Sequence, residues 1–344
     1  MKAAVLTGIR EVELVEMPMP SIKNGHDVLL KIEMVGVCGS DVHYYETGRI
    51  GSQVVKYPYL VGHECAATVV ATGNEVTSVK VGDRIVVEPA ISCHKCDQCL
   101  AGRENTCRNL KFLGCPGQID GCLCEYLVMP EDCCLRVSKD FSFERAVLCE
   151  PLTIGLYAVE ESGLKEGGAA AILGAGPIGL SVLVSANALG VKQCYVTDKI
   201  EARKQAALKG GAVWAGNPDK EDIVEEINKL EKGGMDVVYE CCGEQDAIDQ
   251  GIELLKPGGK MMLIGIPRVD RISFSIDKMR RKEITIINVR RQNRATERCI
   301  EMMASGRIDP DFMVTHRFGL EDSKKAFDLV AGYKDGVIKA MIEM

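Results

Sequence analysis

The sequence lacks an apolar run long enough to cross a membrane. None of its 344 residues falls in an uninterrupted apolar stretch of about 18 residues. Residues 1–16 carry charges at short intervals and lack the apolar core of a secretory signal. Both absences predict a cytoplasmic protein that does not span a membrane.

An excess of positive charge is also lacking. The sequence has 42 Lys and Arg against 49 Asp and Glu, which gives a net charge of −7. Basic residues form only short clusters, at 280–282 and 290–291. Nucleic-acid-binding domains usually carry a basic patch, so the charge pattern predicts a small-molecule ligand and no nucleic-acid partner. Internal repeats and low-complexity segments are absent as well.

Cysteine, in contrast, is abundant, with 16 residues. In a small secreted protein this number would indicate a disulfide framework, but this chain is large and has no export signal. Cys194 and the pair Cys241–Cys242 lie in apolar, strand-like runs, where cysteine usually acts as a small buried hydrophobe. Most of the cysteines are therefore expected to be reduced thiols.

The chain length suits two domains, and the residue pattern changes near residue 150. Before that point, short apolar runs broken by Gly and Pro predict an irregular β domain, with strands at 28–37, 66–71 and 84–88. After it, strands and helices alternate, which predicts a doubly wound parallel α/β sheet. The expected strands are 169–173, 193–197, 236–240, 260–266 and 284–289, and the expected helices are 177–189, 201–209, 219–231 and 244–255. The predicted domains are 1–152 together with 291–344, and 153–290.

A glycine-rich turn follows the first strand of the second region and opens a helix. Its glycines permit a tight turn and close approach of a pyrophosphate, and the helix N-terminus donates backbone N–H groups to the phosphates. Asp198, at the end of the next strand, is expected to accept both ribose hydroxyls, which favours NAD over NADP. Arg203 leaves NADP open as the alternative cofactor, because an arginine can hold a 2′-phosphate. It can instead neutralise Asp198 or stack on adenine. The residues assigned to the turn are Gly174, Gly176, Pro177, Ile178 and Gly179.

Four cysteines lie in a lobe at about residues 90–110, with the spacing C-x2-C-x2-C-x7-C. They are Cys93, Cys96, Cys99 and Cys107. Four thiolates close a tetrahedral shell, which is typical of a structural zinc site. An iron–sulfur cluster is the main alternative because ferredoxins have similar spacings. The many charged residues of the lobe, and the absence of Pro after the last Cys, favour zinc. His94 is expected to be exposed.

A second set of metal-ligand residue types is scattered over the first region. It comprises Cys38, His63, Glu64 and Glu150. One thiolate, one imidazole and one carboxylate make a three-ligand zinc site with an open position, which is the catalytic arrangement. Spacing alone does not establish this site, because a buried core cysteine and a core histidine fit the same positions.

The order of these features resembles that in zinc-containing medium-chain dehydrogenases, and the resemblance covers essentially the whole chain. Within the family, the sequence is most similar to the sorbitol (L-iditol) and xylitol dehydrogenases. The stretches that carry this similarity are 38–44 (CGSDVHY), 48–51 (GRIG), 147–152 (VLCEPL) and 314–318 (VTHRF).

The resemblance implies a Rossmann-type NAD-binding domain and a mostly β, GroES-like catalytic domain, assembled as a homodimer or homotetramer. It implies that Cys38 and His63 bind the catalytic zinc with Glu64 as third ligand, while Glu150 acts directly or through water. The residues alone do not rank the two carboxylates. The resemblance also implies that Ile264 and Val289 belong to the cofactor site.

The implied reaction is the oxidation of a secondary alcohol of a polyol to the ketose, with hydride transfer to NAD. Ser40 would pass the proton toward His43, and Tyr44, Glu150 and Arg290 would contact the substrate. Plainer roles remain: a turn cap for Ser40, a partly exposed strand position for His43 and a core position for Tyr44.

Arg291 stands where many polyol dehydrogenases have Tyr. It either reaches solvent or selects an anionic substrate. The alternatives are therefore a dehydrogenase of a sugar acid, a sugar phosphate or L-threonine, and, from another class, a non-catalytic NAD- or zinc-binding interaction protein.

Overall fold

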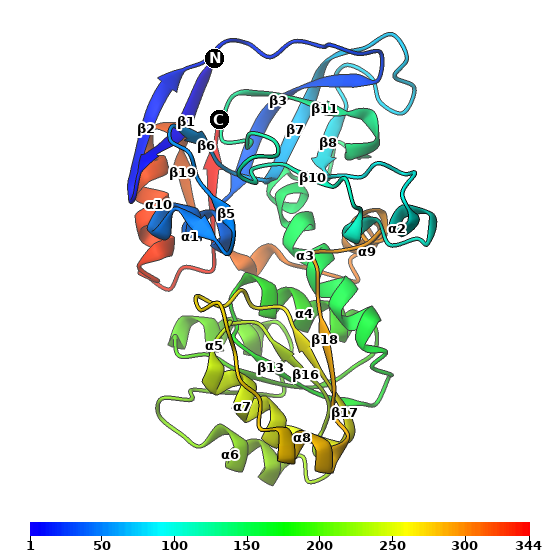
Figure 1. Cartoon of the computed structure of the whole chain (residues 1–344), viewed down its shortest axis with the longest axis vertical. Helices are drawn as coiled ribbons and strands as arrows, with labels where there is room; N and C mark the ends of the chain where they lie inside the picture. The colour runs from blue at the N-terminus through cyan, green and yellow to red at the C-terminus, as the bar shows by residue number, and fades with distance from the viewer. The chain divides into compact units, whose positions relative to one another are not determined.

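The computed structural model describes all 344 residues, which divide into two compact units (Figure 1). Unit 1 comprises Met1–Glu150, Thr296–Ala304 and Val314–Met344, and unit 2 comprises Pro151–Ala295 and Ser305–Met313. No helix of the chain combines the length and the apolar character that a membrane crossing requires.

The predicted division of the chain needs a correction near its end. Residues 291–295 and 305–313 were expected in the first domain but lie in unit 2. The reason is the packing of Phe312 against helix α5 (Glu201–Lys209): the Lys209 ammonium lies 5.9 Å from the centroid of its ring. Residues 305–313 therefore belong to unit 2, and the chain returns to unit 1 at Val314.

Unit 1 is built on a seven-stranded sheet in the order β12-β8-β7-β3-β20-β19, with β11 also paired to β3. Its central strands, β3 (Asp27–Gly36), β7 (Glu64–Thr72) and β8 (Arg84–Val87), agree with the expected strands 28–37, 66–71 and 84–88. The remaining strands are β11 (Tyr126–Pro130), β12 (Cys134–Val137), β19 (Val314–Gly319) and β20 (Lys339–Glu343).

The final strand has a central place in this sheet. β20 pairs antiparallel with β3, so that Met341 lies opposite Gly36 and Glu343 opposite Met34. β3 also pairs with β7, which begins at Glu64. The pairing thus places the last strand of the chain on β3, next to the strand that begins with the predicted metal ligand Glu64.

Smaller elements surround this sheet. A second sheet has the order β2-β1-β6, and two further two-stranded sheets pair β4 with β5 and β9 with β10. Short helices also belong to this unit. The bounds are β1 (Lys2–Gly8), β2 (Glu11–Glu16), α1 (Gly39–Thr47), β4 (Arg49–Ile50), β5 (Gln53–Val54), β6 (Tyr59–Leu60), β9 (Ala90–Ile91), α2 (Asp97–Leu100), β10 (Lys111–Phe112), α9 (Thr296–Ala304) and α10 (Ser323–Ala331).

Two helices correct the prediction of an all-β first region. α1 begins after Cys38, and it buries Asp41, Val42, Tyr44 and Tyr45, which recur at the spacing of one helix face. The assignment of His43 to a strand was therefore wrong. α3 (Phe143–Ser162) has 20 residues and starts in unit 1 but ends in unit 2. It continues through Pro151, which has no N–H to donate within the helix.

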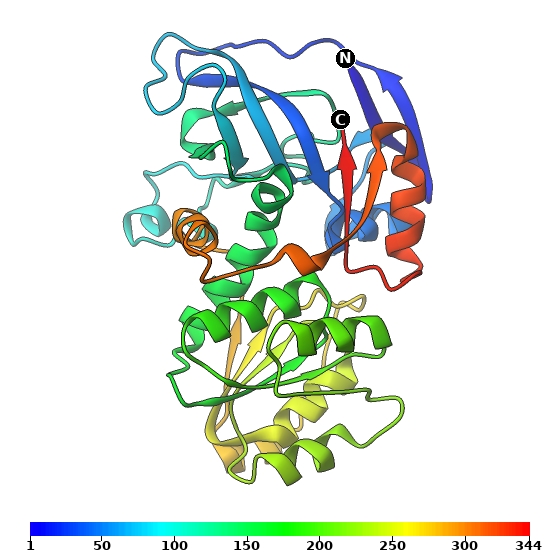
Figure 2. The same ribbon diagram turned by 180° about the vertical axis from the view of Figure 1, so that it is seen from behind.

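Unit 2 is a six-stranded parallel sheet in the order β15-β14-β13-β16-β17-β18, which confirms the doubly wound fold. α7 and α8 lie in front of the sheet in Figure 1, and α4 covers the opposite face in Figure 2. The bounds are β13 (Ala169–Leu173), α4 (Pro177–Ala188), β14 (Gln193–Thr197), β15 (Trp214–Gly216), α6 (Ile223–Leu230), β16 (Met235–Glu240), α7 (Gln245–Leu254), β17 (Leu255–Leu263), α8 (Ile276–Lys282) and β18 (Thr285–Asn288).

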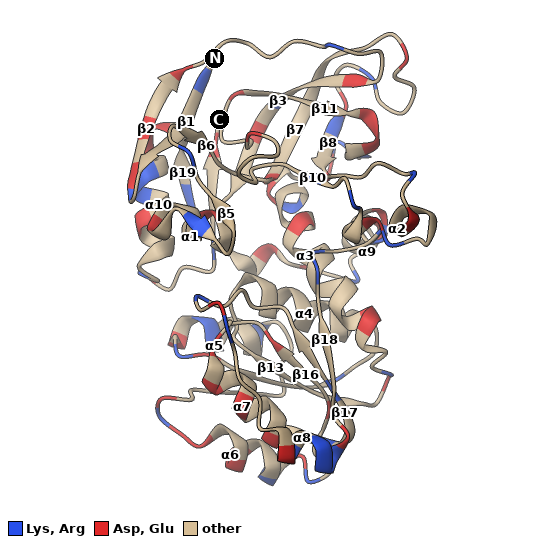
Figure 3. Cartoon of the chain, viewed as in Figure 1, with Lys and Arg blue, Asp and Glu red and all other residues tan.

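Two predicted boundaries in unit 2 shift for local reasons. The helix expected from residue 219 begins at Ile223, because the Asp222 carboxylate accepts hydrogen bonds from the N–H groups of Val224 and Glu225 and caps it. The strand expected at 260–266 ends at Leu263. Acidic and basic residues are mixed over the elements of both units, and the basic turn at the end of α8 is a short cluster (Figure 3).

Candidate functional site

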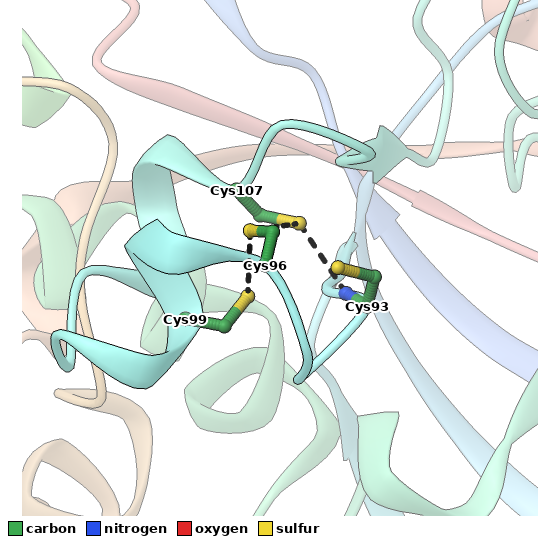
Figure 4. Close-up of side chains that lie close together, drawn as sticks. All are labelled: Cys93, Cys96, Cys99 and Cys107. Atoms are coloured by element: carbon green, nitrogen blue, oxygen red, sulfur yellow. Dashed lines mark hydrogen bonds between the residues drawn. The ribbon is translucent and has the colours of Figure 1, made fainter.

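The four-cysteine lobe brings its sulfur atoms together around one point (Figure 4). The Cys96 Sγ atom lies 3.6 Å from Cys99 Sγ and 3.9 Å from Cys107 Sγ, and Cys93 completes the group. Ligands at about 2.3 Å from a tetrahedral zinc ion are about 3.8 Å apart. The spacing of the sulfur atoms therefore fits a structural zinc ion.

The surroundings of the lobe favour thiolates at two of its positions. Hydrogen bonds from the Lys95 backbone and the Asn109 side chain lower the pKa of Cys93 to about 5. Backbone N–H groups at Cys99 and Arg108 lower the pKa of Cys96 as well. Burial raises the pKa of Cys99 to about 12, so this thiol needs the charge of a metal for deprotonation.

A second group of possible ligands lies where α1, β7 and the turn before β7 meet in unit 1. The ligand atoms of Cys38, His63 and Glu64 lie within 4.8 Å of one another. His63 and Glu64 are buried and adjacent in sequence, whereas Cys38 immediately precedes α1. A thiolate, an imidazole and a carboxylate at this separation can hold one zinc ion and leave a fourth position open.

Asp41 lies beside the ring of His63. Its Oδ1 atom is at an ion-pair distance of 3.2 Å from Nδ1 of His63, without the geometry of a hydrogen bond. A carboxylate on this side of the ring leaves Nε2 for a metal. The carboxylate is 1% exposed, and it also accepts a hydrogen bond from the Cys38 N–H at 3.4 Å. Burial lowers the pKa of His63, but Asp41 and Cys38 outweigh it and raise that pKa well above its usual value. Asp41 thus couples the imidazole and the start of α1.

Glu64 has a second partner at the far end of the chain. Both of its carboxylate oxygens accept hydrogen bonds from the Lys339 ammonium, at 2.6 and 2.8 Å. Lys339 also donates to the carbonyl of Val37 at 3.4 Å. Each member of the pair is 1% exposed, so the charges compensate each other inside the core.

Glu150 lies close to this group without being part of it. It is buried at the end of the unit 1 segment of α3, and its carboxyl is outside the set of atoms that lie within 4.8 Å of one another. Burial and the charges of Glu64 and Glu88 raise the pKa of Glu150 to about 7, against the opposing effects of His63 and Lys339. Of the two candidate carboxylates, only Glu64 is within ligand distance of both Cys38 and His63.

Three of the predicted proton-relay and substrate residues, Ser40, His43 and Tyr44, lie on α1. The Ser40 hydroxyl donates to Cys38 Sγ at 3.3 Å, so it contacts a candidate ligand atom directly. His43 is half-buried on the helix. Tyr44 is buried and donates its hydroxyl to Gln53 Oε1 at 3.2 Å. The structure therefore places Ser40 at the metal group and Tyr44 one helical turn after Asp41.

The glycine-rich turn of unit 2 has the geometry expected for a dinucleotide site. Gly174 follows β13 with a φ of +101°, which is a backbone conformation that other residues rarely adopt. A Cβ atom at Gly179 would overlap the carbonyl oxygen of Gly174, so the helix can approach the turn this closely only with glycine. Gly176 caps α4, and Pro177 and Ile178 are its first residues. The N-terminus of α4 thus lies beside the gap between β13 and β16, where the strand order reverses.

Asp198 and Arg203 flank this turn. The Asp198 carboxylate accepts hydrogen bonds from the N–H groups of Ala175 and Ile200, both at 2.8 Å. Each of its oxygens retains a lone pair for a ribose hydroxyl. Arg203 is buried, and its guanidinium would lie 3.6 Å from a Cβ atom at Gly176. This position, beside the turn, agrees with a contact to the cofactor or with neutralisation of Asp198.

The other residues predicted for unit 2 follow its last two strands. Ile264 comes directly after β17 and Val289 directly after β18, at the carboxyl edge of the sheet. Arg290 is exposed, and Arg291 is half-buried with a left-handed φ of 53°.

Three residues of the unit 1 site were missed by sequence analysis. They are Asp41, Lys339 and Phe112, whose ring lies 5.3 Å from that of His63. Asp41 belongs to the quoted CGSDVHY run, so its position was available. The only sequence feature that pointed to Lys339 was its single charge within an otherwise apolar run. No feature of the sequence pointed to Phe112.

Comparison with known proteins shows what the chain is similar to. The family model of the alcohol dehydrogenase GroES-like domain matches residues 24–139, and that of the zinc-binding dehydrogenases matches 177–305. The chain is 36% identical to sorbitol dehydrogenase of Bacillus subtilis, over 99% of this chain and 97% of the relative. It is 33% identical to D-xylulose reductase A of Aspergillus oryzae, over 98% and 95%.

A solved structure shows the same fold with a cofactor bound. A zinc-binding dehydrogenase of Sinorhizobium meliloti, crystallised with NADP, matches with a TM-score of 0.90 and 29% identity, over 100% of this chain and 99% of the other.

Proposed function

Because the chain belongs to the zinc-binding alcohol dehydrogenase family, we propose that it oxidises a secondary alcohol of a polyol to the ketose, with hydride transfer to NAD. The observation that carries this proposal is the group formed by Cys38, His63 and Glu64, which offers three ligands for one ion. A structural metal would be enclosed by four protein ligands, as in the cysteine lobe. A zinc ion held by these three residues would have a fourth position for a substrate hydroxyl.

The polyol class is supported by the names of the relatives. Sorbitol dehydrogenase and D-xylulose reductase each match almost the whole chain. Polyols carry neighbouring hydroxyls, and Glu150 offers a buried carboxyl close to the metal group that can hydrogen-bond a second hydroxyl. This contact would favour polyols over simple alcohols.

The residues of unit 1 prepare the substrate hydroxyl for hydride loss. When bound, zinc lowers the pKa of a coordinated hydroxyl. Cys38 and His63 hold the ion with Glu64, and Asp41 keeps the imidazole of His63 in the ligating orientation. The proton released by the substrate passes to Ser40, whose hydroxyl already contacts Cys38 Sγ, and then toward His43. NAD, when bound at unit 2, would supply the hydride acceptor for the carbinol carbon.

Asp198 supports NAD as the acceptor. Its carboxylate is held at the glycine-rich turn by two backbone N–H groups, and a 2′-phosphate would meet this negative charge. The NADP-bound relative shows that the fold also takes the other cofactor. Arg203 is the residue of this chain that would have to compensate a 2′-phosphate.

We also propose that the chain forms a homo-oligomer through the edge of the unit 2 sheet. β18 is the last strand in the sheet order, and its outer backbone groups have no partner strand. Ile276, on the neighbouring α8, is 73% exposed. A dimer would pair β18 with its symmetry copy, and sedimentation equilibrium tests this: a monomer at micromolar concentration contradicts it.

The cytoplasm is the proposed compartment. None of the 16 cysteines forms a disulfide in the structure, which suits a reducing environment. Cell fractionation tests this assignment.

The deciding experiment combines zinc analysis with NAD reduction on a substrate panel. The panel contains sorbitol, xylitol, L-iditol, galactitol, L-threonine, and several sugar acids and sugar phosphates. Two zinc ions per chain and turnover of a neutral polyol support the proposal. Turnover of an anionic substrate alone would contradict the polyol assignment and make Arg291 the specificity residue. No turnover at full zinc content would favour a non-catalytic binding protein.

A further inference from the structure

A carboxylate, that of Glu240, is buried at the carboxyl end of β16 in unit 2. Glu240 is 1% exposed. Its Oε1 atom accepts hydrogen bonds from the N–H groups of Cys242 and Gly243, at 2.8 and 2.6 Å, and from the Cys242 thiol at 3.1 Å. These donors belong to the three residues that follow Glu240, and no basic side chain is among them. Burial of a carboxylate is unfavourable unless hydrogen bonds compensate it, and here one turn, 241–243, supplies them.

The 241–243 turn packs against the glycine-rich turn. The Cys241 N–H donates to the carbonyl of Leu173 at 2.9 Å. A Cβ atom at Gly174 would lie only 3.2 Å from Cβ of Cys242. The two turns end β16 and β13, the neighbouring strands at which the strand order reverses, and dinucleotides bind in the crevice at such a point. The 241–243 turn therefore borders the crevice where the cofactor is expected.

The loop after β17 confines this turn from the other side. The N–H groups of Ile264 and Gly265 donate to the backbone carbonyl of Glu240, at 2.9 and 3.0 Å. A Cβ atom at Gly265 would overlap the backbone nitrogen of Gly243 and would lie 2.7 Å from Glu240 Oε2. The turn is thus wedged between Gly174 and Gly265, and it cannot shift far without displacing one of them.

We propose that Glu240 is a positioning residue for the cofactor, because it holds the 241–243 turn in the conformation that the crevice requires. This inference rests on the proposed NAD-dependent function. Gly243 has a left-handed φ of 73°, and its N–H and that of Cys242 converge on one carboxylate oxygen. A buried N–H without an acceptor is unfavourable, so the turn would rearrange if the carboxylate were removed. A preformed crevice binds its ligand more tightly than one that must be ordered on binding.

The test measures NAD binding to the zinc-loaded full chain by calorimetry, without an alcohol substrate. Glu240→Met keeps most of the side-chain volume but removes the carboxylate acceptor, so the dissociation constant of NAD should rise at least about tenfold. Glu240→Gln keeps an acceptor oxygen for both N–H groups and should stay within about threefold of the wild type. Gly265→Ala leaves Glu240 in place but displaces the turn, and it should weaken NAD binding as well.

Asp236→Leu is the matched control, because Asp236 lies near the opposite end of the same strand. Its carboxylate accepts from the Ala169 N–H at 2.9 Å and pairs with Lys256. This variant should lower the unfolding temperature and keep the wild-type affinity for NAD.

Wild-type NAD affinity in Glu240→Met overturns the positioning role and leaves the dehydrogenase function intact. Binding as weak in Glu240→Gln as in Glu240→Met also overturns it, because the charge and not the turn would then be responsible. If Glu240→Met does not fold, Gly265→Ala decides, and wild-type affinity in that variant overturns the role. Absence of NAD binding by the wild type overturns the cofactor assignment as well.

Discussion

The Lys339 ammonium binds both carboxylate oxygens of Glu64, and so the last strand of the chain holds a residue of the metal-ligand group. The two side chains are each 1% exposed, and their hydrogen bonds are 2.6 and 2.8 Å long. A carboxylate has about four lone pairs, so Glu64 can accept both bonds and still offer one lone pair to a metal. Lys339 thereby positions Glu64 and compensates part of the negative charge gathered there.

Lys339→Met should destabilise the protein strongly. The substitution keeps most of the side-chain volume but leaves the Glu64 carboxylate buried without its cation. Loss of one partner of a buried pair costs about 3–5 kcal/mol. The free energy of unfolding, measured by urea titration of zinc-free protein so that no metal replaces the lost cation, should fall by about this amount.

The double variant Lys339→Met with Glu64→Gln provides the control. It removes both charges, so it should recover a large part of the lost stability. A loss below about 1 kcal/mol in the single variant, or no recovery in the double variant, would show that the pair is not the source of the effect.

Asp41→Asn should weaken zinc binding at the catalytic group. The amide can accept from His63 Nδ1–H only through its oxygen and can also present its NH2 group, so the ligating orientation of the imidazole is no longer enforced. The expected result is a 10- to 100-fold rise in the zinc dissociation constant, on the order seen for such outer contacts. Competition with a chromogenic chelator measures it.

Asp328→Asn is the control for this substitution. Asp328 accepts from the buried Tyr45 hydroxyl and has no contact with the metal group. Its replacement should affect stability and leave zinc affinity unchanged. If both variants bind zinc as the wild type does, Asp41 does not orient His63.

Much of this arrangement was predictable from sequence, and the rest was not for identifiable reasons. Strands of unit 2 such as Ala169–Leu173 and Gln193–Thr197 were predicted residue for residue, because short apolar runs bounded by glycine leave few alternatives. α1 was missed by sequence analysis because this helix has only nine residues and buries only one face. A helix this short is specified by its packing in unit 1, which local pattern does not contain.

The site shows the same division between local and long-range information. The glycine-rich turn and Asp198 form a local motif and could be read from spacing. Lys339 is 275 residues from Glu64, and only the pairing of β20 with β3 brings them together.

Cys96→Ser should remove the structural zinc without removing the catalytic one. Cys96 Sγ contacts the sulfurs of both Cys99 and Cys107, so its loss opens the tetrahedral shell. Zinc analysis should give one ion per chain where the wild type has two. The thermal unfolding temperature should fall because the loop around residues 93–107 loses its cross-link.

Cys133→Ser is the matched control, since Cys133 is buried in unit 1 outside the lobe. It should retain two zinc ions. If Cys96→Ser also retains two, the lobe does not bind zinc.

Asp198→Ala should relax the choice of cofactor. The substitution removes the carboxylate that is held by the N–H groups of Ala175 and Ile200, and with it the expected bonds to the ribose hydroxyls. KM for NAD should rise at least about tenfold, while kcat/KM for NADP should rise because the repulsion of a 2′-phosphate is gone and Arg203 remains beside the turn. Asp219→Ala, which removes the exposed Asp219 that pairs with Lys199 in the same unit, should change neither value. If Asp198→Ala binds NAD as the wild type does, residues other than Asp198 bind the ribose. If kcat/KM for NADP does not rise, Arg203 interacts with protein groups and not with the cofactor.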